Sequence, residues 1–179
     1  PWRSRKLESV NASTPVVHQQ FVLLSECYEL GSVLLQILDE DHEVVWSDQG
    51  KRDKALATHW NTPILVDGMI YGCSGRHSSD AELRCVEFKT GEVRWSKPGY
   101  ARSSLTWIDG HLVLLDEQGR LVLVKANPER FEAVTEYDGR KHTVRFKSPC
   151  WAAPIVSHGL MFVRGKDELV CFDLIPERQ

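Results

Sequence analysis

Apolar residues recur along this chain in short runs of strand length rather than at helical spacing. One stretch shows the pattern clearly: Ile64-Leu65-Val66 and Met69-Ile70-Tyr71 flank Asp67-Gly68, and a third run covers 83–88. Asp-Gly between apolar runs favours a tight hairpin, because glycine takes the positive φ that the turn needs without strain. The pattern therefore predicts antiparallel strands joined by short turns, and no long helix.

This pattern occurs four times, in segments that begin at Thr14, Thr62, Ser104 and Ala153. Corresponding positions 15, 63, 105 and 154 are 48, 42 and 49 residues apart, and a period in the forties is typical of propeller blades. We therefore predict an all-β fold, a β-propeller of about four blades, each of four antiparallel strands. The blades are expected at 14–47, 62–97, 104–147 and 153–175, within one propeller segment that covers 1–179.

The turn and the last strand vary between the copies. Asp109-Gly110 and His158-Gly159 repeat the hairpin turn, whereas Gln19-Gln20 in the first copy predicts a different one. Trp46 and Trp95 mark the fourth strand of the first two copies and are expected in the core. The third copy has Phe131-Glu132-Ala133-Val134 at this place, and the segment 1–7 is expected to be an outer strand of another or of the closing blade.

Composition and charge narrow the function classes. The 179 residues are 42% hydrophobic and carry a formal net charge of −3 with no long run of one sign, which argues against nucleic-acid binding. No apolar stretch reaches the roughly 18 residues of a membrane helix, and no signal-peptide pattern opens the sequence. None of the five cysteines forms a CxxC pair, so a zinc knuckle is not expected; Cys85 and Cys171 are expected to be small core residues, and disulfide pairing stays open.

The second copy resembles the PQQ-like, or quinoprotein-like, β-propeller repeat. The residues that carry the likeness are Trp60 to Tyr71, Leu83 to Val86 and Lys89 to Trp95. Segments 74–77, 116–121 and 169–174 also resemble the C-terminal half of uncharacterised bacterial proteins of this family. The resemblance implies an exported bacterial protein, periplasmic or extracellular, whose full ring commonly has eight blades. The implied partners are missing N-terminal blades or a second copy of the chain.

The family's enzymes are expected to carry an adjacent Cys-Cys disulfide, a carboxylate base beside calcium, and a tryptophan under the quinone. This sequence has no adjacent cysteines, and its acidic run 39–43 falls where a hairpin tip is predicted. We therefore predict a non-catalytic binding or scaffold module with no evident cofactor and no catalytic or metal-binding residue. The alternative is half of a quinone-dependent alcohol dehydrogenase-like oxidoreductase, with PQQ and calcium bound only if the full ring is an enzyme.

Five candidate ligand-binding residues precede the first strand of a copy, where the propeller fold places them at the central funnel, and two lie in the loop 75–80 between the second and third strands of the second copy. An imidazole, indoles, guanidinium groups and an amide together suit a polar or anionic small molecule, or a protein ligand. The alternative for the tryptophans is packing between blades, and for the arginine-histidine loop 75–80 it is packing on the neighbouring blade. The candidates are His59, Trp60, Asn61, Arg76, His77, Arg102 and Trp151.

Overall fold

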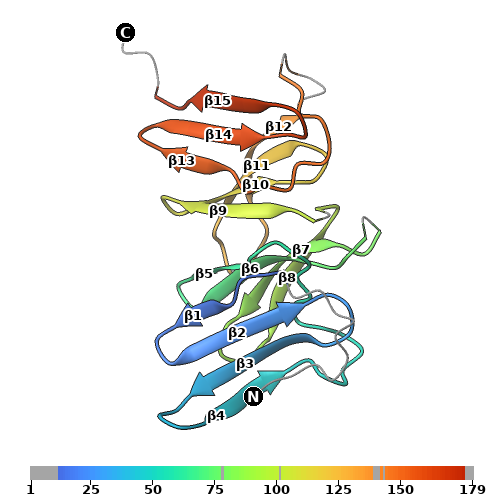
Figure 1. The fold of residues 1–179 in the computed structure, drawn as a ribbon, viewed down its shortest axis with the longest axis vertical. Coiled ribbons are helices and arrows are strands. Elements are labelled where there is room, and N and C mark those ends of the chain that lie inside the picture. Colours follow the sequence, from blue (N-terminus) through green and yellow to red (C-terminus); the bar gives the residue numbers. More distant parts are fainter. Residues whose placement is uncertain (1–11, 78, 101, 139–141, 143, 176–179) are drawn as a thin grey trace. The chain divides into compact units, whose positions relative to one another are not determined.

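The computed structural model contains strands and turns and no helix in the residues that it describes, which are 12–77, 79–100, 102–138, 142 and 144–175 (Figure 1). Each sheet is an antiparallel meander in which strands adjacent in sequence pair. The predicted arrangement of about four blades of antiparallel strands is confirmed: three sheets have four strands, and the last has three within the described residues. Sheet 1 contains β1 (Val16–His18), β2 (Phe21–Glu26), β3 (Gly31–Ile37) and β4 (His42–Ser47); sheet 2 contains β5 (Ile64–Val66), β6 (Met69–Ser74), β7 (Glu82–Glu87) and β8 (Val93–Pro98); sheet 3 contains β9 (Ser104–Ile108), β10 (His111–Leu115), β11 (Arg120–Lys125) and β12 (Ala133–Asp138); sheet 4 contains β13 (Ile155–Ser157), β14 (Leu160–Arg164) and β15 (Leu169–Asp173).

The chain divides into two compact units, which are described separately. Unit 1 contains sheets 1 and 2 and also the short segment Pro128–Phe131. Unit 2 contains sheets 3 and 4. The N-terminal segment 1–7, for which an outer strand is predicted, lies outside the described residues.

The hairpin turns follow the sequence prediction. Gly68, Gly110 and Gly159 have φ values of 79°, 75° and 77°, and the residue before each also has positive φ. In sheet 1 the positive φ is at Gln19 (53°) and not at Gln20, so this turn differs from the other three. The acidic run 39–43 forms the tip between β3 and β4, where residues 39–41 are exposed.

The fourth strands of sheets 1, 2 and 3 carry equivalent residues, which a β-bulge identifies in each of these sheets. Leu34 pairs with Trp46, Cys85 with Trp95, and Leu123 with Thr135, and the register shifts immediately afterwards in all three. Thr135, and not Val134 as the sequence comparison implied, therefore occupies the tryptophan position of sheet 3. The two tryptophans are half-buried rather than fully buried, which corrects the expectation of core positions.

Trp46 joins the two sheets of unit 1. Its Nε1 donates a hydrogen bond to the carbonyl oxygen of Phe88 at 2.9 Å. A Cβ at Gly91 would lie 2.8 Å from Trp46 Cδ2, so the Thr-Gly turn after β7 needs glycine beneath the indole. Trp46 also packs on a core cluster drawn from both sheets, which includes Leu34 and Ile70.

The cysteines have different environments. All five lie within the described residues, and none is in a disulfide. Cys85 is fully buried, and burial raises its thiol pKa to about 11. Cys171 is exposed, so its predicted core position is wrong; it lies on β15, whose described pairing is to β14 alone.

Candidate ligand-binding site

A long loop between β4 and β5 carries two of the predicted site residues, His59 and Trp60. Buried Asp48 fixes the start of this loop, because its Oδ2 accepts hydrogen bonds from the backbone N–H groups of Ala55 at 3.0 Å and Leu56 at 3.4 Å. Further along, the N–H of Thr58 donates to Ser25 Oγ at 3.0 Å. The loop is therefore pinned to sheet 1 up to the residue before His59.

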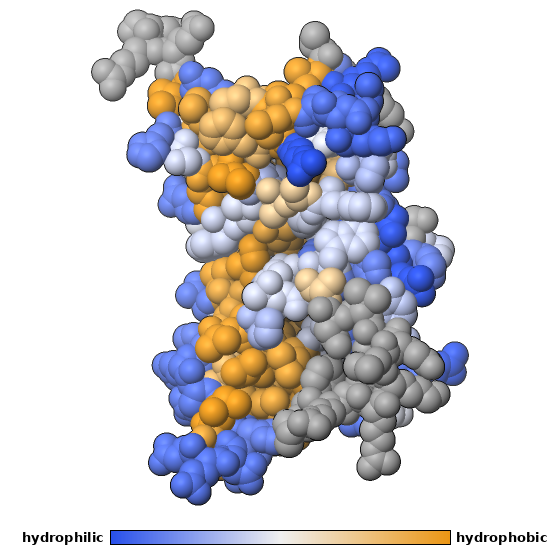
Figure 2. Space-filling view, viewed as in Figure 1, coloured by the Kyte–Doolittle hydropathy of each residue, from blue (hydrophilic) through white to orange (hydrophobic). Residues whose placement is uncertain are grey.

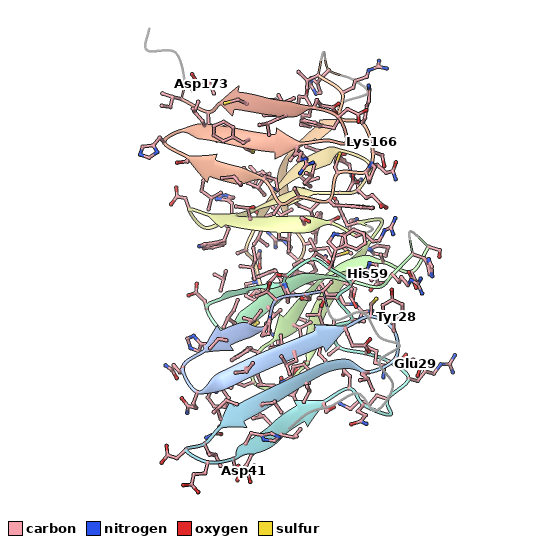
Figure 3. The ribbon with its side chains drawn as sticks, viewed as in Figure 1. Tyr28, Glu29, Asp41, His59, Lys166 and Asp173 are labelled. Atoms are coloured by element: carbon pink, nitrogen blue, oxygen red, sulfur yellow. The ribbon has the colours of Figure 1, made fainter. Side chains whose placement is uncertain are left out.

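A second turn, between β2 and β3, presents Tyr28 at the same edge of unit 1 (Figure 3). The carboxylate of Glu26 is buried beneath this turn and accepts hydrogen bonds from the backbone N–H groups of residues 28 to 31. A carboxylate that accepts several backbone N–H groups is a strong local restraint, since the bonds are charge-assisted. Glu26 thus holds the backbone on both sides of Tyr28.

Tyr28, His59 and Trp60 form a continuous aromatic series. Tyr28 Oη lies 3.1 Å from His59 Nε2, and the centroids of these two rings are 5.7 Å apart. The centroids of the His59 and Trp60 rings are 4.6 Å apart. All three residues are half-buried.

An arginine stacks on each end of this series. The guanidinium carbon of Arg76 lies 4.6 Å from the Tyr28 ring centroid, and that of Arg102 lies 5.0 Å from the Trp60 ring. We call these five residues the aromatic–arginine cluster: Tyr28, His59, Trp60, Arg76 and Arg102. A guanidinium over an aromatic face is attracted by the negative face of the ring, and stacking limits the rotamers that the side chain must give up on binding.

The backbone at Arg102 is unusual. Its φ is 49°, and among the described non-glycine residues it is the one with positive φ outside the tight hairpin turns between the first two strands of each sheet. An arginine in this region of backbone space costs on the order of 1 kcal/mol, and such strain clusters at functional sites. The residue with this positive φ is thus the same residue whose guanidinium lies over the Trp60 ring.

The half-buried Cys27 lies next to Tyr28 in the chain. The pKa of its thiol is raised to about 11, mainly by burial and also by the Glu26 carboxylate, while the Arg76 guanidinium opposes both effects. The thiol is therefore protonated at neutral pH and has little thiolate for nucleophilic chemistry. The cluster offers cations and aromatic faces rather than an activated nucleophile.

The structure thus brings together four predicted residues, His59, Trp60, Arg76 and Arg102. For the other three predicted residues the structure shows different contacts. Asn61 is buried, and its backbone carbonyl accepts a hydrogen bond from Ser13 Oγ at 3.3 Å. His77 is exposed, and its backbone N–H donates to Asp80 Oδ1 at 2.7 Å.

Trp151, the last predicted residue, belongs to unit 2 and is 53% exposed. Its Nε1 donates to Glu117 Oε1 at 2.8 Å, which places a carboxylate rather than a cation beside the indole. Sequence reasoning missed Tyr28. The signal that could have found it is topological, because in an antiparallel meander the β2–β3 turn and the loops before β1 and β5 share an edge.

The described residues contain neither a cluster of metal ligands nor a membrane-spanning helix. No three or more His, Cys, Asp or Glu side chains in this part of the chain are grouped so that they could hold a metal ion. The same residues contain no helix of the length and apolar character that a membrane crossing requires.

No family model matches the sequence, and no curated protein sequence matches it either. Solved structures do match. BamB from Moraxella catarrhalis superimposes with a TM-score of 0.61 and 13% identity over 91% of this chain and 43% of BamB. The computationally designed protein Ika4 gives a TM-score of 0.66 and 11% identity over 95% of this chain and 94% of Ika4.

A third similar structure is a complex of Saccharomyces cerevisiae Dbp5 bound to Nup159, with a TM-score of 0.54 and 13% identity over 84% of this chain and 37% of the matched chain. The present chain spans less than half the length of BamB. At such low identity these likenesses describe the fold alone. With the four antiparallel meanders, they establish that this chain folds as a β-propeller.

Proposed function

We propose that this chain is a non-catalytic binding module of a β-propeller protein, and that the aromatic–arginine cluster binds a carboxylate-bearing segment of a protein partner. The observation that carries the proposal is the pair of guanidinium groups stacked on Tyr28 and Trp60, with His59 between the two rings. Arginine, tryptophan and tyrosine are the residue types that dominate the energetic centres of protein interfaces.

The charge of the cluster sets the chemistry of the ligand. A guanidinium group carries positive charge, and the geometry of its donors matches a carboxylate in a bidentate manner. Each such hydrogen-bonded charge pair contributes about 1.5–3 kcal/mol, so two pairs together contribute about 3–6 kcal/mol and support a dissociation constant on the order of 1 mM for a short acidic peptide. The fold likeness to a chain in the Dbp5–Nup159 complex is consistent with a protein partner, without identifying one.

Nuclear magnetic resonance can test where an acidic peptide binds. The probe is acetyl-Asp-Glu-Asp-Glu-amide, and acetyl-Asn-Gln-Asn-Gln-amide is the neutral control. We expect saturable shifts of the Trp60 Nε1–H signal with the acidic peptide alone, and at least tenfold weaker binding in Arg102→Ala and Arg76→Ala. Arg94→Ala is the matched control, because this arginine is on β8 of the same unit and pairs with Glu92 at 3.8 Å.

The outcomes separate the possible ligands. Equal saturation by free glutarate would assign the site to a small dicarboxylate rather than to a peptide. Shifts that Arg94→Ala weakens as much as Arg102→Ala would contradict the proposed site. Dye-linked alcohol oxidation on addition of PQQ and calcium ions would contradict the non-catalytic part of the proposal.

The PQQ-like resemblance supports a wider proposal about the whole protein. We propose a member of that propeller family, bacterial and exported to the periplasm or beyond, whose partner is further blades or a second copy of this chain. Sheet 4 supports this idea, since it exposes Ile155 by 65% and Leu169 by 68%. A dimer in analytical ultracentrifugation, or a need for an added N-terminal segment, is the expected result; a stable 20.4 kDa monomer would contradict it.

A further inference from the structure

Unit 2 contains an apolar pocket between sheets 3 and 4. Its volume is about 460 Å³, which is within the usual range for small-molecule sites. Figure 2 shows hydrophobic residues gathered over β13–β15 in this unit. The apolar lining comes from both sheets and includes Ile108, Val113, Leu123, Met161, Phe172 and Leu174.

The pocket occupies the place that the Trp46 indole fills in unit 1. Thr135, which also lines the pocket, is the counterpart of Trp46, since each pairs with the residue before the β-bulge. The wall of the pocket opposite Thr135 also has a counterpart in unit 1. Phe88 N–H donates to Gly68 O at 2.9 Å, and Leu174 N–H donates to Gly159 O at 2.8 Å, so Leu174 is the counterpart of Phe88.

The same comparison extends to the side walls. Ile70 pairs with Val86 in sheet 2, and Met161 pairs with Phe172 in sheet 4 at the corresponding place after the hairpin turn. Ile70 and Val86 belong to the core cluster against which Trp46 packs, whereas Met161 and Phe172 line the pocket. A threonine side chain is much smaller than an indole, so the exchange opens the space between the sheets.

We propose that this pocket binds a small planar aromatic molecule that carries a ring N–H, of the indole class. In unit 1 the Trp46 Nε1–H donates to Phe88 O at 2.9 Å, and the carbonyl of Leu174 is the equivalent acceptor. Glu136 and Asp173 are also among the lining residues; the Asp173 carboxylate accepts the N–H of Ile175 at 2.9 Å, and Glu136 Oε1 lies 3.9 Å from Arg120 Nε. This site is separate from the aromatic–arginine cluster and does not depend on the function proposed for it.

Methionine labelling provides a direct test in the unmodified protein. The chain has two methionines: Met161 lines the pocket, and Met69 is on β6 of unit 1. With ¹³C-methyl methionine, indole should shift the Met161 signal saturably, with a dissociation constant of about 1 mM or tighter, and leave Met69 unchanged. 1-Methylindole, which lacks the N–H, should bind at least fivefold more weakly.

Two variants complete the test. Thr135→Trp should fill the pocket, weaken indole binding at least tenfold and raise Tm by about 2–4 °C. Trp46→Ala should open the equivalent space in unit 1 and create indole binding there, seen as a shift of Met69 or of nearby methyl groups. The proposal is overturned if indole leaves Met161 unshifted in the wild-type protein, or if Thr135→Trp folds and binds indole as the wild type does.

Discussion

Removing the carboxylate of Glu26 should both destabilise the fold and loosen the aromatic–arginine cluster. The carboxylate is fully buried and accepts N–H groups from four successive residues, including Tyr28 at 2.9 Å, Glu29 at 3.0 Å and Gly31 at 3.2 Å. In Glu26→Ala these donors lose a charged acceptor. The Glu29 part of the turn is exposed, so water can replace some of the bonds, whereas Gly31 is buried.

The expected loss of stability follows from this difference between the exposed and the buried N–H donors. A hydrogen bond to a charged group contributes about 1.5–3 kcal/mol, and a buried donor left without an acceptor loses about 1–3 kcal/mol. With most of the exposed turn rehydrated, we expect Glu26→Ala to lower the free energy of unfolding by about 3 kcal/mol. Glu26→Gln keeps the shape and one neutral acceptor, so about half of that loss is expected.

Urea denaturation followed by circular dichroism measures both values. Glu29→Ala is the matched control, because its side chain is exposed on the same turn; its free energy of unfolding should change by less than about 0.5 kcal/mol. The acidic peptide should also bind Glu26→Ala about fivefold more weakly, since Tyr28 is no longer held. A Glu26→Ala protein as stable as Glu29→Ala would refute the role assigned to this carboxylate.

Three further predictions concern the core and the thiols. Trp46→Ala removes the indole, and Gly91→Ala places a Cβ 2.8 Å from Trp46 Cδ2. Each variant should therefore lower the free energy of unfolding by about 2–3 kcal/mol in urea titrations. A change below about 0.5 kcal/mol in both variants would contradict the packing. At pH 8 iodoacetamide should label exposed Cys171 well before buried Cys85, as peptide mass spectrometry would show, and equal rates would count against the burial assigned to them. Because burial raises the Cys85 pKa from 9.0 to about 11, the protonated thiol stabilises the fold fully below pH 9 and progressively less as the pH rises towards 11. Tm measured across that range should therefore fall less steeply in Cys85→Ala than in the wild type. Parallel curves of Tm against pH would refute the raised pKa.

The fold was predictable from the sequence because its strongest signals are local. Asp-Gly turns specify positive φ through two neighbouring residues, and alternating apolar runs specify the strands around them. The position of Thr135 was misjudged by one residue because a β-bulge leaves no clear mark in the sequence. The half-burial of Trp46 and the exposure of Cys171 depend on what packs beside each sheet, which the pattern of one repeat does not contain.

The candidate site was predictable in part. His59, Trp60 and Arg102 precede first strands, and repeat position alone places them at one edge of a meander. Tyr28 reaches the cluster because buried Glu26 shapes its turn, and a buried glutamate in a strand-to-strand turn reads in sequence as an ordinary solvated residue. The stacking of Arg102 on Trp60 comes with a positive φ at a non-glycine residue. The residue type at a position gives no signal for such a backbone conformation.

Calorimetric titration of the acidic tetrapeptide into the wild-type protein and the Arg76→Ala/Arg102→Ala double variant tests the central claim most directly. The account predicts a wild-type dissociation constant on the order of 1 mM at low salt, and the affinity should weaken severalfold when salt is raised, because the attraction is between partly exposed charges. It predicts no measurable heat of binding in the double variant. Wild-type and double-variant titrations with the same affinity would contradict the assignment of the aromatic–arginine cluster as the binding site.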